Sequence, residues 1–238
     1  MIVAHRGASK DAPENTLEAF RLAWLQKADA IEGDFRFTKD GQIVCIHDED
    51  TSRTCGEKMI VAESTYTELS QLDASTHFKG DLTPQSIPLL SEVFKSIPNN
   101  KGIYIEIKCG PEIVPNLINL IIDSDLRKEQ ISIIAFDSQV IKAFKSIAPQ
   151  IKAHWLYDVN EPVSINELLD TLEDIKADGL GSNNTNSKEL VNSICKAGFE
   201  YHSWTIDDNQ VAEQLLKWGA ASITTNQPSY LRQQLSSN

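Results

Sequence analysis

Short runs of β-branched and aliphatic residues alternate with amphipathic stretches along this whole chain, and this alternation restricts the possible folds more than any other feature. The segments that we predict to be strands are 2–5, 30–35, 43–47, 103–108, 131–136, 153–157, 201–206 and 222–225, with a weaker one at 179–182. The segments that we predict to be helices are 16–27, 89–97, 112–122, 138–147, 165–175, 187–196 and 210–218. Alternating strands and helices indicate a parallel sheet covered by helices.

An open, doubly wound sheet and a closed barrel would both give this alternation. No glycine-rich phosphate loop follows the first strand, which weighs against a dinucleotide-binding sheet. Polar residues also gather near the carboxyl ends of several strands, where barrel enzymes build their sites. We therefore predict an α/β fold, a single (β/α)8 TIM-type barrel over residues 1–238, with a small insertion at about 49–87, after the second strand region.

The net charge and the composition restrict the kinds of molecule that this protein could bind and the compartment in which it could work. The formal net charge of −12 opposes binding to nucleic acid or to an anionic membrane face. No apolar run is long enough for a membrane span, so we expect no membrane insertion. The N-terminus lacks a secretory signal pattern, and the four cysteines show no CxxC pairing. We expect reduced thiols and a cytoplasmic location.

Acidic residues occupy alternate positions on two predicted strands. Glu32 and Asp34 are two residues apart, which puts both carboxylates on one face of a strand. Glu106 and Lys108 are spaced in the same way between isoleucines. Three carboxylates from two strands form a hard oxygen ligand set, suited to one Mg²⁺ or Ca²⁺ ion rather than zinc. The alternative is a pair of solvated edge strands, but charges on apolar strands are costly unless they are paired or bound to metal.

Two histidines end predicted strands, His5 on the first and His47 on segment 43–47. Imidazole titrates near neutral pH, so one ring could take a proton from a nucleophile while the other gives one to a leaving group. A lone histidine at a strand end is usually structural, and two histidines with one carboxylate can instead bind iron. We favour the acid/base pair because three carboxylates already suffice for a hard cation.

Arg6 and Lys108 bring positive charge to the same strand ends. An arginine can grip two phosphate oxygens, and a lysine acts as a point charge. Both residues could equally compensate the neighbouring carboxylates, and the two roles do not exclude each other.

Several motifs, in order along nearly the whole chain, resemble those of the glycerophosphodiester phosphodiesterase family. They are His5-Arg6-Gly7 with Pro13-Glu14-Asn15-Thr16, Glu32-Gly33-Asp34, Thr38-Lys39-Asp40-Gly41, His47-Asp48, Ile87-Pro88-Leu89-Leu90, Ile105-Glu106-Ile107-Lys108, Trp204-Thr205 and Ile223-Thr224-Thr225-Asn226-Gln227-Pro228.

The resemblance implies a β/α barrel with an insertion, and Ca²⁺- or Mg²⁺-dependent hydrolysis of small-molecule glycerophosphodiesters to sn-glycerol 3-phosphate and an alcohol. It makes His5 and His47 the acid/base pair. Glu32, Asp34 and Glu106 become metal ligands. Arg6 and Lys108 become phosphate contacts, and Trp204 an apolar wall for the glycerol moiety.

The chain departs from the family pattern at two positions. Ala135 stands where serine is common, and Asn226 where aspartate is common. Neither belongs to the expected metal and histidine set, so the departures concern the outer pocket and the alcohol preference. His77, His154 and His202 are expected to be structural.

Several questions stay open at the level of sequence. They are the alcohol removed, the choice between Mg²⁺ and Ca²⁺, the oligomeric state, and whether water or a glycerol hydroxyl attacks. We lean to His5 as base and His47 as acid. A non-catalytic barrel would have lost the histidines, and an enzyme acting on phospholipid at a membrane would need an apolar or basic docking surface.

Overall fold

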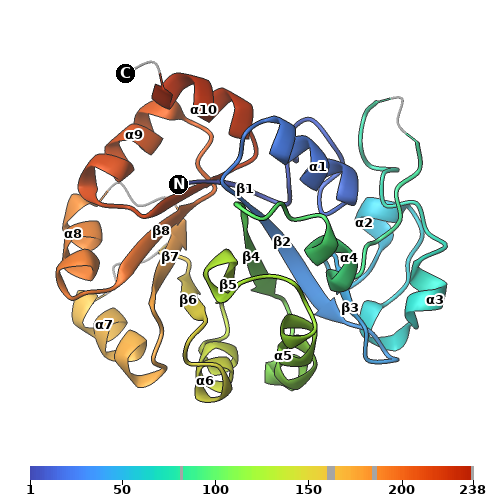
Figure 1. The fold of residues 1–238 in the computed structure, drawn as a ribbon, viewed down its shortest axis with the longest axis horizontal. Coiled ribbons are helices and arrows are strands. Elements are labelled where there is room, and N and C mark those ends of the chain that lie inside the picture. The colour runs from blue at the N-terminus through green and yellow to red at the C-terminus, as the bar shows by residue number, and fades with distance from the viewer. Residues whose placement is uncertain (81–82, 160–163, 184–186, 237–238) are drawn as a thin grey trace.

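The computed structural model describes residues 1–80, 83–159, 164–183 and 187–236, and its centre is a closed barrel of parallel strands ringed by helices (Figure 1). The barrel closes because β1 pairs in parallel with both β9 and β2. The remaining barrel strands follow in the order β9, β8, β7, β6, β5, β4, β2. The predicted eight-stranded TIM-type barrel is confirmed.

Each strand of the barrel is short and mostly buried, as in other barrels of this class. The strands are β1 (Ile2–Ala4), β2 (Ala30–Phe37), β3 (Ile43–Cys45), β4 (Gly102–Ile107), β5 (Ile131–Ala135), β6 (Lys152–Tyr157), β7 (Gly179–Asn183), β8 (Glu200–Trp204) and β9 (Ser222–Thr225). The α-helices are α1 (Leu17–Leu25), α2 (Ser52–Cys55), α3 (Tyr66–Leu69), α4 (Leu90–Lys95), α5 (Val114–Ile122), α6 (Ser138–Ile147), α7 (Ile165–Asp174), α8 (Lys188–Lys196), α9 (Asn209–Trp218) and α10 (Pro228–Ser236). Three 3₁₀ turns complete the set: η1 (Val61–Glu63), η2 (Pro111–Ile113) and η3 (Lys128–Gln130).

Two segments differ from the sequence prediction. The strand predicted at 43–47 is the shorter β3, which pairs antiparallel with β2 and lies outside the barrel ring. The weaker candidate at 179–182 is β7, a full member of the barrel. Its glycines and serine gave a faint β signal because β propensity reflects side-chain packing, which small residues provide poorly.

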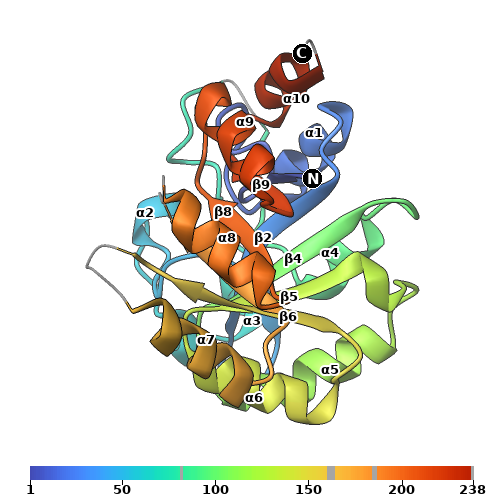
Figure 2. The same ribbon diagram turned by 90° about the vertical axis from the view of Figure 1, so that its left-hand side faces the viewer.

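The last helix, α10, was not predicted, because its first residue, Pro228, ends the last motif and its sequence is polar. It lies beside the end of α1 in both views (Figures 1 and 2). Arg232 of α10 donates two hydrogen bonds to the carbonyl of Lys27 just after α1. The end of the chain is thereby attached to its beginning.

Apolar residues form two concentric layers. The larger layer lies between the strands and the surrounding helices and includes Phe20, Phe35 and Phe144. A smaller cluster is made by Val3, Ala30, Tyr104, Ile134 and Leu156, with Trp204 packed against it. The inward-facing residues therefore fill the barrel as a packed core, as expected for eight strands.

Segment 49–87, predicted as an insertion, contains α2, η1 and α3 between β3 and α4. Its residues 81 and 82 lie outside the described part of the chain. It forms a separate small apolar cluster with β3 that includes Val44, Val61 and Leu69. Figure 1 shows α2 and α3 at the periphery, beside β3. The segment thus packs against the flank of the barrel near the end of β2.

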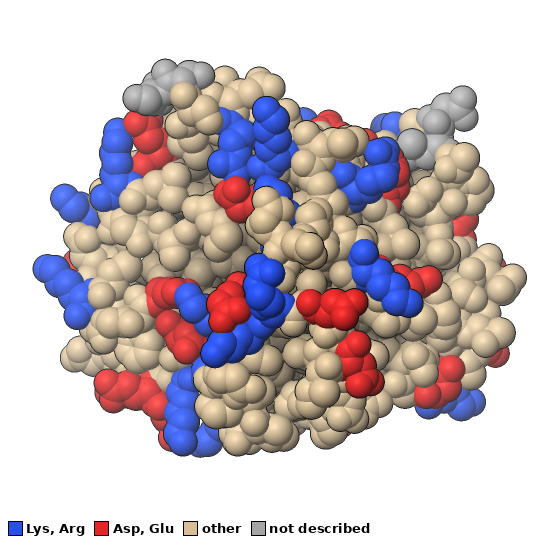
Figure 3. Space-filling model, viewed as in Figure 1, with Lys and Arg blue, Asp and Glu red and all other residues tan. Residues whose placement is uncertain are grey.

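The surface carries charges of both signs. In the face shown in Figure 3, lysine and arginine lie among aspartate and glutamate rather than in one large patch of a single sign. All four cysteines are free, and Cys45 and Cys55 are buried. Among the described residues, no helix combines the length and the apolar character that crossing a membrane requires.

Candidate active site

The turn after β1 brings the first motif to the barrel mouth. Arg6 and Gly7 both have positive φ, 54° and 82°. A Cβ at Gly7 would lie 2.6 Å from the backbone carbon of Ala19 in α1, so only glycine allows the turn to pack this closely. The turn places the amide of Arg6 on the Glu32 carboxylate, with an N–O distance of 2.8 Å.

Three carboxylates meet on the adjacent strands β2 and β4. Glu32, Asp34 and Glu106 are buried, and one oxygen of each lies within 4.8 Å of the others. Strand register explains the meeting, because Asp34 pairs directly with Glu106. The structure brings together the three residues that the sequence analysis selected.

Burial and mutual repulsion oppose the simultaneous ionisation of all three carboxyl groups. Burial, followed by the charge of Asp34, raises the pKa of Glu32 to about 8 and that of Glu106 to about 8. Burial also opposes ionisation of Asp34, but Arg6 and Lys108 outweigh it and lower the pKa of this carboxyl. Among the described residues, Glu32 Oε1 has no hydrogen-bond partner.

A hard divalent cation fits this donor set. The buried, converging oxygens match the oxygen-only coordination of Mg²⁺ and Ca²⁺, and Glu32 Oε1 is a buried acceptor with its ligand position unused. A cation at this point would offset the mutual repulsion that raises the two pKa values.

Asn15 fixes the orientation of Asp34. Its amide nitrogen donates to Asp34 Oδ2 at 2.8 Å, and its carbonyl accepts the backbone amide of Asp34 at 3.1 Å. The sequence analysis did not give Asn15 this role. The N-cap of α1 is Thr16, whose hydroxyl accepts from the amide of Ala19.

Arg6 and Lys108 both contact the carboxylates. Arg6 Nε lies 3.1 Å from Asp34 Oδ2, and Lys108 Nζ lies 3.3 Å from Asp34 Oδ1. Lys108 also forms an ion pair with Glu106 Oε1. The charge-compensating role considered from sequence is therefore present, and both side chains also line the cavity described below.

His5 is held by a chain of hydrogen bonds at the end of β9. Its Nδ1 lies 2.8 Å from Asn226 Oδ1, and Asn226 Nδ2 donates to Asp207 Oδ2 at 2.8 Å. Because a carboxylate can only accept, the Asn226 amide must turn its oxygen toward His5. Nδ1 of His5 therefore carries the proton, and Nε2 keeps a free lone pair. Burial, followed by the charge of Arg6, lowers the pKa of His5.

His47 has a carboxylate partner instead. Its Nδ1 lies 2.7 Å from Asp48 Oδ1, and Arg53 of α2 donates to the other oxygen of Asp48. Arg53 also grips Glu14 with two hydrogen bonds of 2.9 and 2.7 Å. Burial lowers the pKa of His47, while Asp34 and Asp48 oppose that effect. Segment 49–87 thus supplies the arginine that positions the partner of His47.

These residues surround one cavity of about 210 Å³. Its charged side holds His5, Arg6, Glu32, His47, Glu106 and Lys108. Its other side is apolar, with Phe136 and Trp204 meeting edge to face at 5.4 Å between ring centroids. Trp204 Nε1 is buried without a hydrogen-bond partner among the described residues. The cavity is smaller than the roughly 300 Å³ at which drug-sized pockets begin, and it suits a small molecule with an anionic end and a carbon face.

Comparison with known proteins identifies the family. The family model described as "Glycerophosphoryl diester phosphodiesterase family" matches residues 5–230. The chain belongs to this family. A glycerophosphodiester phosphodiesterase of Caldanaerobacter subterraneus subsp. tengcongensis is 34% identical over 97% of this chain and 96% of its own length. One from Bacillus subtilis is 28% identical over 96% of this chain and 84% of its own length.

Solved structures share the fold. An Oleispira antarctica phosphodiesterase in complex with the product sn-glycerol-3-phosphate superimposes with a TM-score of 0.90 at 24% identity, covering 99% of this chain and 96% of that chain. A glycerophosphodiester phosphodiesterase from Agrobacterium tumefaciens gives a TM-score of 0.80 at 26% identity, covering 97% of both chains. This phosphodiesterase barrel is therefore shared over its full length.

Sequence reasoning missed some members of this phosphodiesterase site. Asn226 was noted only as a departure in the outer pocket, whereas the structure shows it bonded to His5. Asp207 and Arg53 were not selected. Asp207 contacts Asn226, 19 positions further along the sequence, and Arg53 contacts Glu14, 39 positions earlier. Local spacing therefore gave no signal for either residue.

Proposed function

We propose that this protein hydrolyses glycerophosphodiesters to sn-glycerol 3-phosphate and an alcohol, using one Mg²⁺ or Ca²⁺ ion and proton transfer by His5 and His47. The main support is the meeting of three buried carboxylates with two histidines around one small cavity. Family membership and the product named for the Oleispira antarctica structure support the substrate class.

Glu32, Asp34 and Glu106 would hold the cation. When bound, the ion supplies positive charge to a phosphoryl oxygen and stabilises the charge that develops there. Arg6 and Lys108 line the same side of the cavity and add fixed positive charge toward the phosphate.

The two histidines divide the proton transfers according to their partners. His5 has its Nδ1 proton directed at a neutral amide oxygen, which leaves Nε2 free to take a proton from the nucleophile. Burial lowers the pKa of His47, and the hydrogen bond to the Asp48 carboxylate opposes that effect by stabilising the protonated ring, which the neutral amide does less for His5. We therefore assign His5 as the base, and His47 as the acid that protonates the leaving alkoxide.

The apolar side of the cavity orients the remainder of the substrate. Phe136 and Trp204 present a carbon surface to the glycerol backbone, and the unused N–H of Trp204 can donate to a substrate oxygen. The part of the cavity beside Phe136 would accept different alcohol groups of the substrate, because Phe136 is 42% exposed.

The decisive experiment measures glycerol 3-phosphate released from glycerophosphocholine, glycerophosphoethanolamine and glycerophosphoglycerol. We expect release with added Mg²⁺ or Ca²⁺ and none after chelation. A Glu106→Gln variant should require a higher cation concentration, and a Glu112→Gln variant, at an exposed position after β4, should match the wild type. Release of phosphocholine instead of choline, or full activity in excess chelator, would refute the proposal.

A further inference from the structure

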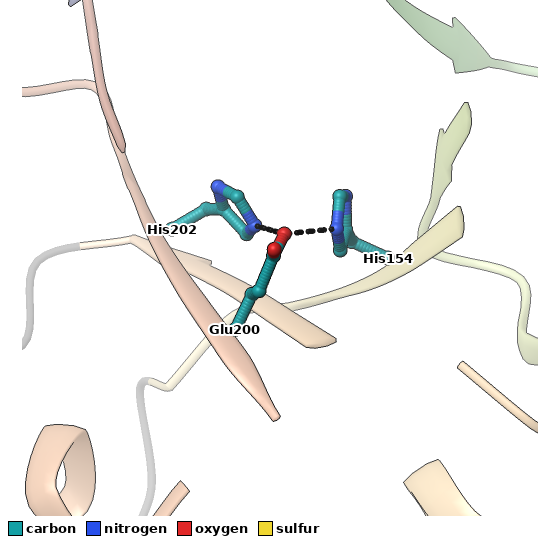
Figure 4. Close-up of side chains that lie close together, drawn as sticks. All are labelled: His154, Glu200 and His202. Carbon is teal, nitrogen blue, oxygen red and sulfur yellow. Dashed lines mark hydrogen bonds and ion pairs between the residues drawn. The ribbon is translucent and has the colours of Figure 1, made fainter. Parts of the chain in front are cut away.

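A second cluster of metal-ligand side chains lies at the opposite end of the barrel. His154 of β6 and both Glu200 and His202 of β8 direct their side chains toward one another (Figure 4). The two histidines are 1% and 5% exposed. Glu200 is the first residue of β8, and the cavity beside this cluster is lined by the first residues of several strands, whereas the site described above opens at the opposite end of the barrel. The proposed hydrolysis leaves this cluster without a role.

Strand register explains how the three side chains meet. Gly179 of β7 pairs with His154 on one side and with Glu200 on the other. Because glycine has no side chain, nothing from β7 separates the residues of β6 and β8. A Cβ at Gly179 would lie 2.3 Å from the carbonyl oxygen of Glu200, so this close approach requires glycine.

The distances match those around a tetrahedral ion. Nε2 of His154 lies 3.2 Å from Glu200 Oε2, and Nε2 of His202 lies 3.4 Å from the same oxygen. Metal–ligand bonds of about 2.0–2.1 Å at tetrahedral angles separate the ligand atoms by roughly 3.4 Å. Both separations from Glu200 Oε2 fit such a polyhedron, and one ligand atom of each of the three residues lies within 4.8 Å of the others.

Outer contacts hold two of the three ligands, His202 and Glu200, whereas Nδ1 of His154 is buried without a hydrogen-bond partner among the described residues. Nδ1 of His202 lies 2.7 Å from Ser222 Oγ, which leaves Nε2 as the nitrogen that faces Glu200. Among the described residues, this buried Nε2 has no hydrogen-bond partner of acceptable geometry. The other Glu200 oxygen forms an ion pair with Lys152. Oriented imidazoles and carboxylates of this kind surround known metal sites.

The ligand types favour a borderline transition metal. Two imidazoles with one carboxylate suit Zn²⁺, whereas Mg²⁺ and Ca²⁺ prefer oxygen ligands alone. A cavity of about 300 Å³, lined in part by Tyr104, Lys152, Glu200 and His202, opens at this end of the barrel. It provides an entry path for the ion and space for a water molecule as the fourth ligand.

We propose that His154 Nε2, Glu200 Oε2 and His202 Nε2 bind one Zn²⁺ ion at the amino-terminal end of the barrel. The site is separate from the carboxylate cluster of Glu32, Asp34 and Glu106. Bound zinc links β6 to β8 across β7 and stabilises this end of the barrel. The competing arrangement is a metal-free network in which the Glu200 carboxylate accepts a hydrogen bond from each imidazole.

The test is equilibrium dialysis of the whole protein against micromolar Zn²⁺ in the presence of millimolar Mg²⁺, which occupies oxygen-only sites. The wild type should retain one zinc ion per chain. Glu200→Gln and His202→Gln should weaken zinc binding by about 100-fold or more, since loss of an outer contact alone typically costs about 10–100-fold. His77→Gln in segment 49–87 should bind zinc as the wild type does.

Zinc binding by a Glu106→Gln variant shows which of the two sites holds the ion. This variant should keep its zinc, and loss of zinc from it would place the ion at the carboxylate cluster and overturn the inference. Absence of zinc from the wild type would overturn it without any variant, as would unchanged binding in Glu200→Gln. Co²⁺ offers an independent readout, because four-coordinate Co²⁺ absorbs visible light strongly, and this absorption should be missing in Glu200→Gln. Circular dichroism of each metal-free variant checks that it is folded.

Discussion

Nδ1 of His5 lies 2.8 Å from Oδ1 of Asn226, although the two residues are 221 positions apart. This contact fixes which nitrogen of His5 carries the proton, because Asp207 holds the amide of Asn226 in one orientation. A neutral amide thus takes the place of the carboxylate that orients histidine in many hydrolases. His47, by contrast, has the carboxylate of Asp48 as the partner of its Nδ1.

Replacing Asn226 with alanine should lower kcat by about 10–100-fold, less than removing a proton-transfer group outright. His5 would lose the acceptor that holds its tautomer, while the substrate contacts would remain, so KM should change little. Steady-state kinetics with glycerophosphocholine provide the measurement. Ser9→Ala is the matched control. Ser9 also donates a hydrogen bond to Asn226 Oδ1, and its removal leaves the contact between Asn226 and His5 in place. Equal losses in both variants would contradict a specific role for Asn226.

Alanine at His5 or at His47 should lower turnover of a natural diester by about 10²–10⁴-fold. A substrate with a nitrophenol leaving group separates their roles, because that group needs no proton to depart. His47→Ala should recover most of its rate with this substrate, and His5→Ala should not. The reverse pattern would exchange the acid and the base.

The rate of the wild type should also depend on pH in a defined direction. Burial, then Arg6, lowers the pKa of His5 below its usual value of about 6.5. A base with a lowered pKa stays unprotonated to lower pH, so kcat/KM should begin to fall only below about pH 6.5. An acidic limb centred above this value would show that His5 is not the base that controls the profile.

Arg53→Gln should reduce kcat/KM by about 10-fold. The side chain joins Glu14 to Asp48, and Asp48 orients His47. Hydrogen bonds between charged groups contribute about 1.5–3 kcal/mol, and partial exposure of Arg53 brings the effect to the lower end of this range. Lys58→Gln, which removes an exposed ion pair with Asp50 in the same segment, should leave the kinetics unchanged.

Asp29 should make the stability of the protein sensitive to acid. Burial opposes its ionisation, but the amide of Ile2 and the guanidinium of Arg232 outweigh burial and lower its pKa. A lowered pKa means that the carboxylate stabilises the fold above its ordinary pKa of about 3.9, and that this stabilisation disappears as the pH falls below that value.

The measurement compares urea unfolding of the wild type and Asp29→Asn. The difference should be about 1 kcal/mol at pH 7, limited by the partial exposure of Asp29, and should shrink as the pH falls below about 3.9. Asp174→Asn, which removes an exposed ion pair with Lys142, should show little difference at either pH. If the difference in unfolding free energy between the wild type and Asp29→Asn increased at acidic pH, it would contradict this account.

Local spacing was sufficient to predict much of the barrel and the carboxylate cluster. Alternation along β2 and β4 places Glu32, Asp34 and Glu106 on the face that turns inward, and parallel register brings Asp34 beside Glu106. The same reasoning failed for β3, since an apolar run of this length gives no indication of strand direction.

The spacing of residues within one segment could not predict contacts between segments that lie far apart in the sequence. The link from Arg53 to Glu14 spans 39 positions and depends on how segment 49–87 packs against the barrel. His154 was predicted to be structural because it lies within a strand, and His202 because it was expected to sit deeper in the barrel than Trp204 on the same face. Only the register across Gly179 shows that they meet at Glu200.

The pairing of β1 with β9 has a consequence for the time at which activity arises during synthesis. While the chain grows from its N-terminus, β1 lacks one neighbour and His5 lacks Asn226 until residues 222–226 have left the ribosome. Contacts of such long sequence separation form late, because the entropy of closing the intervening chain must be overcome first. A nascent chain that stalls before residue 222 therefore lacks both the strand that closes the barrel and the amide that orients His5.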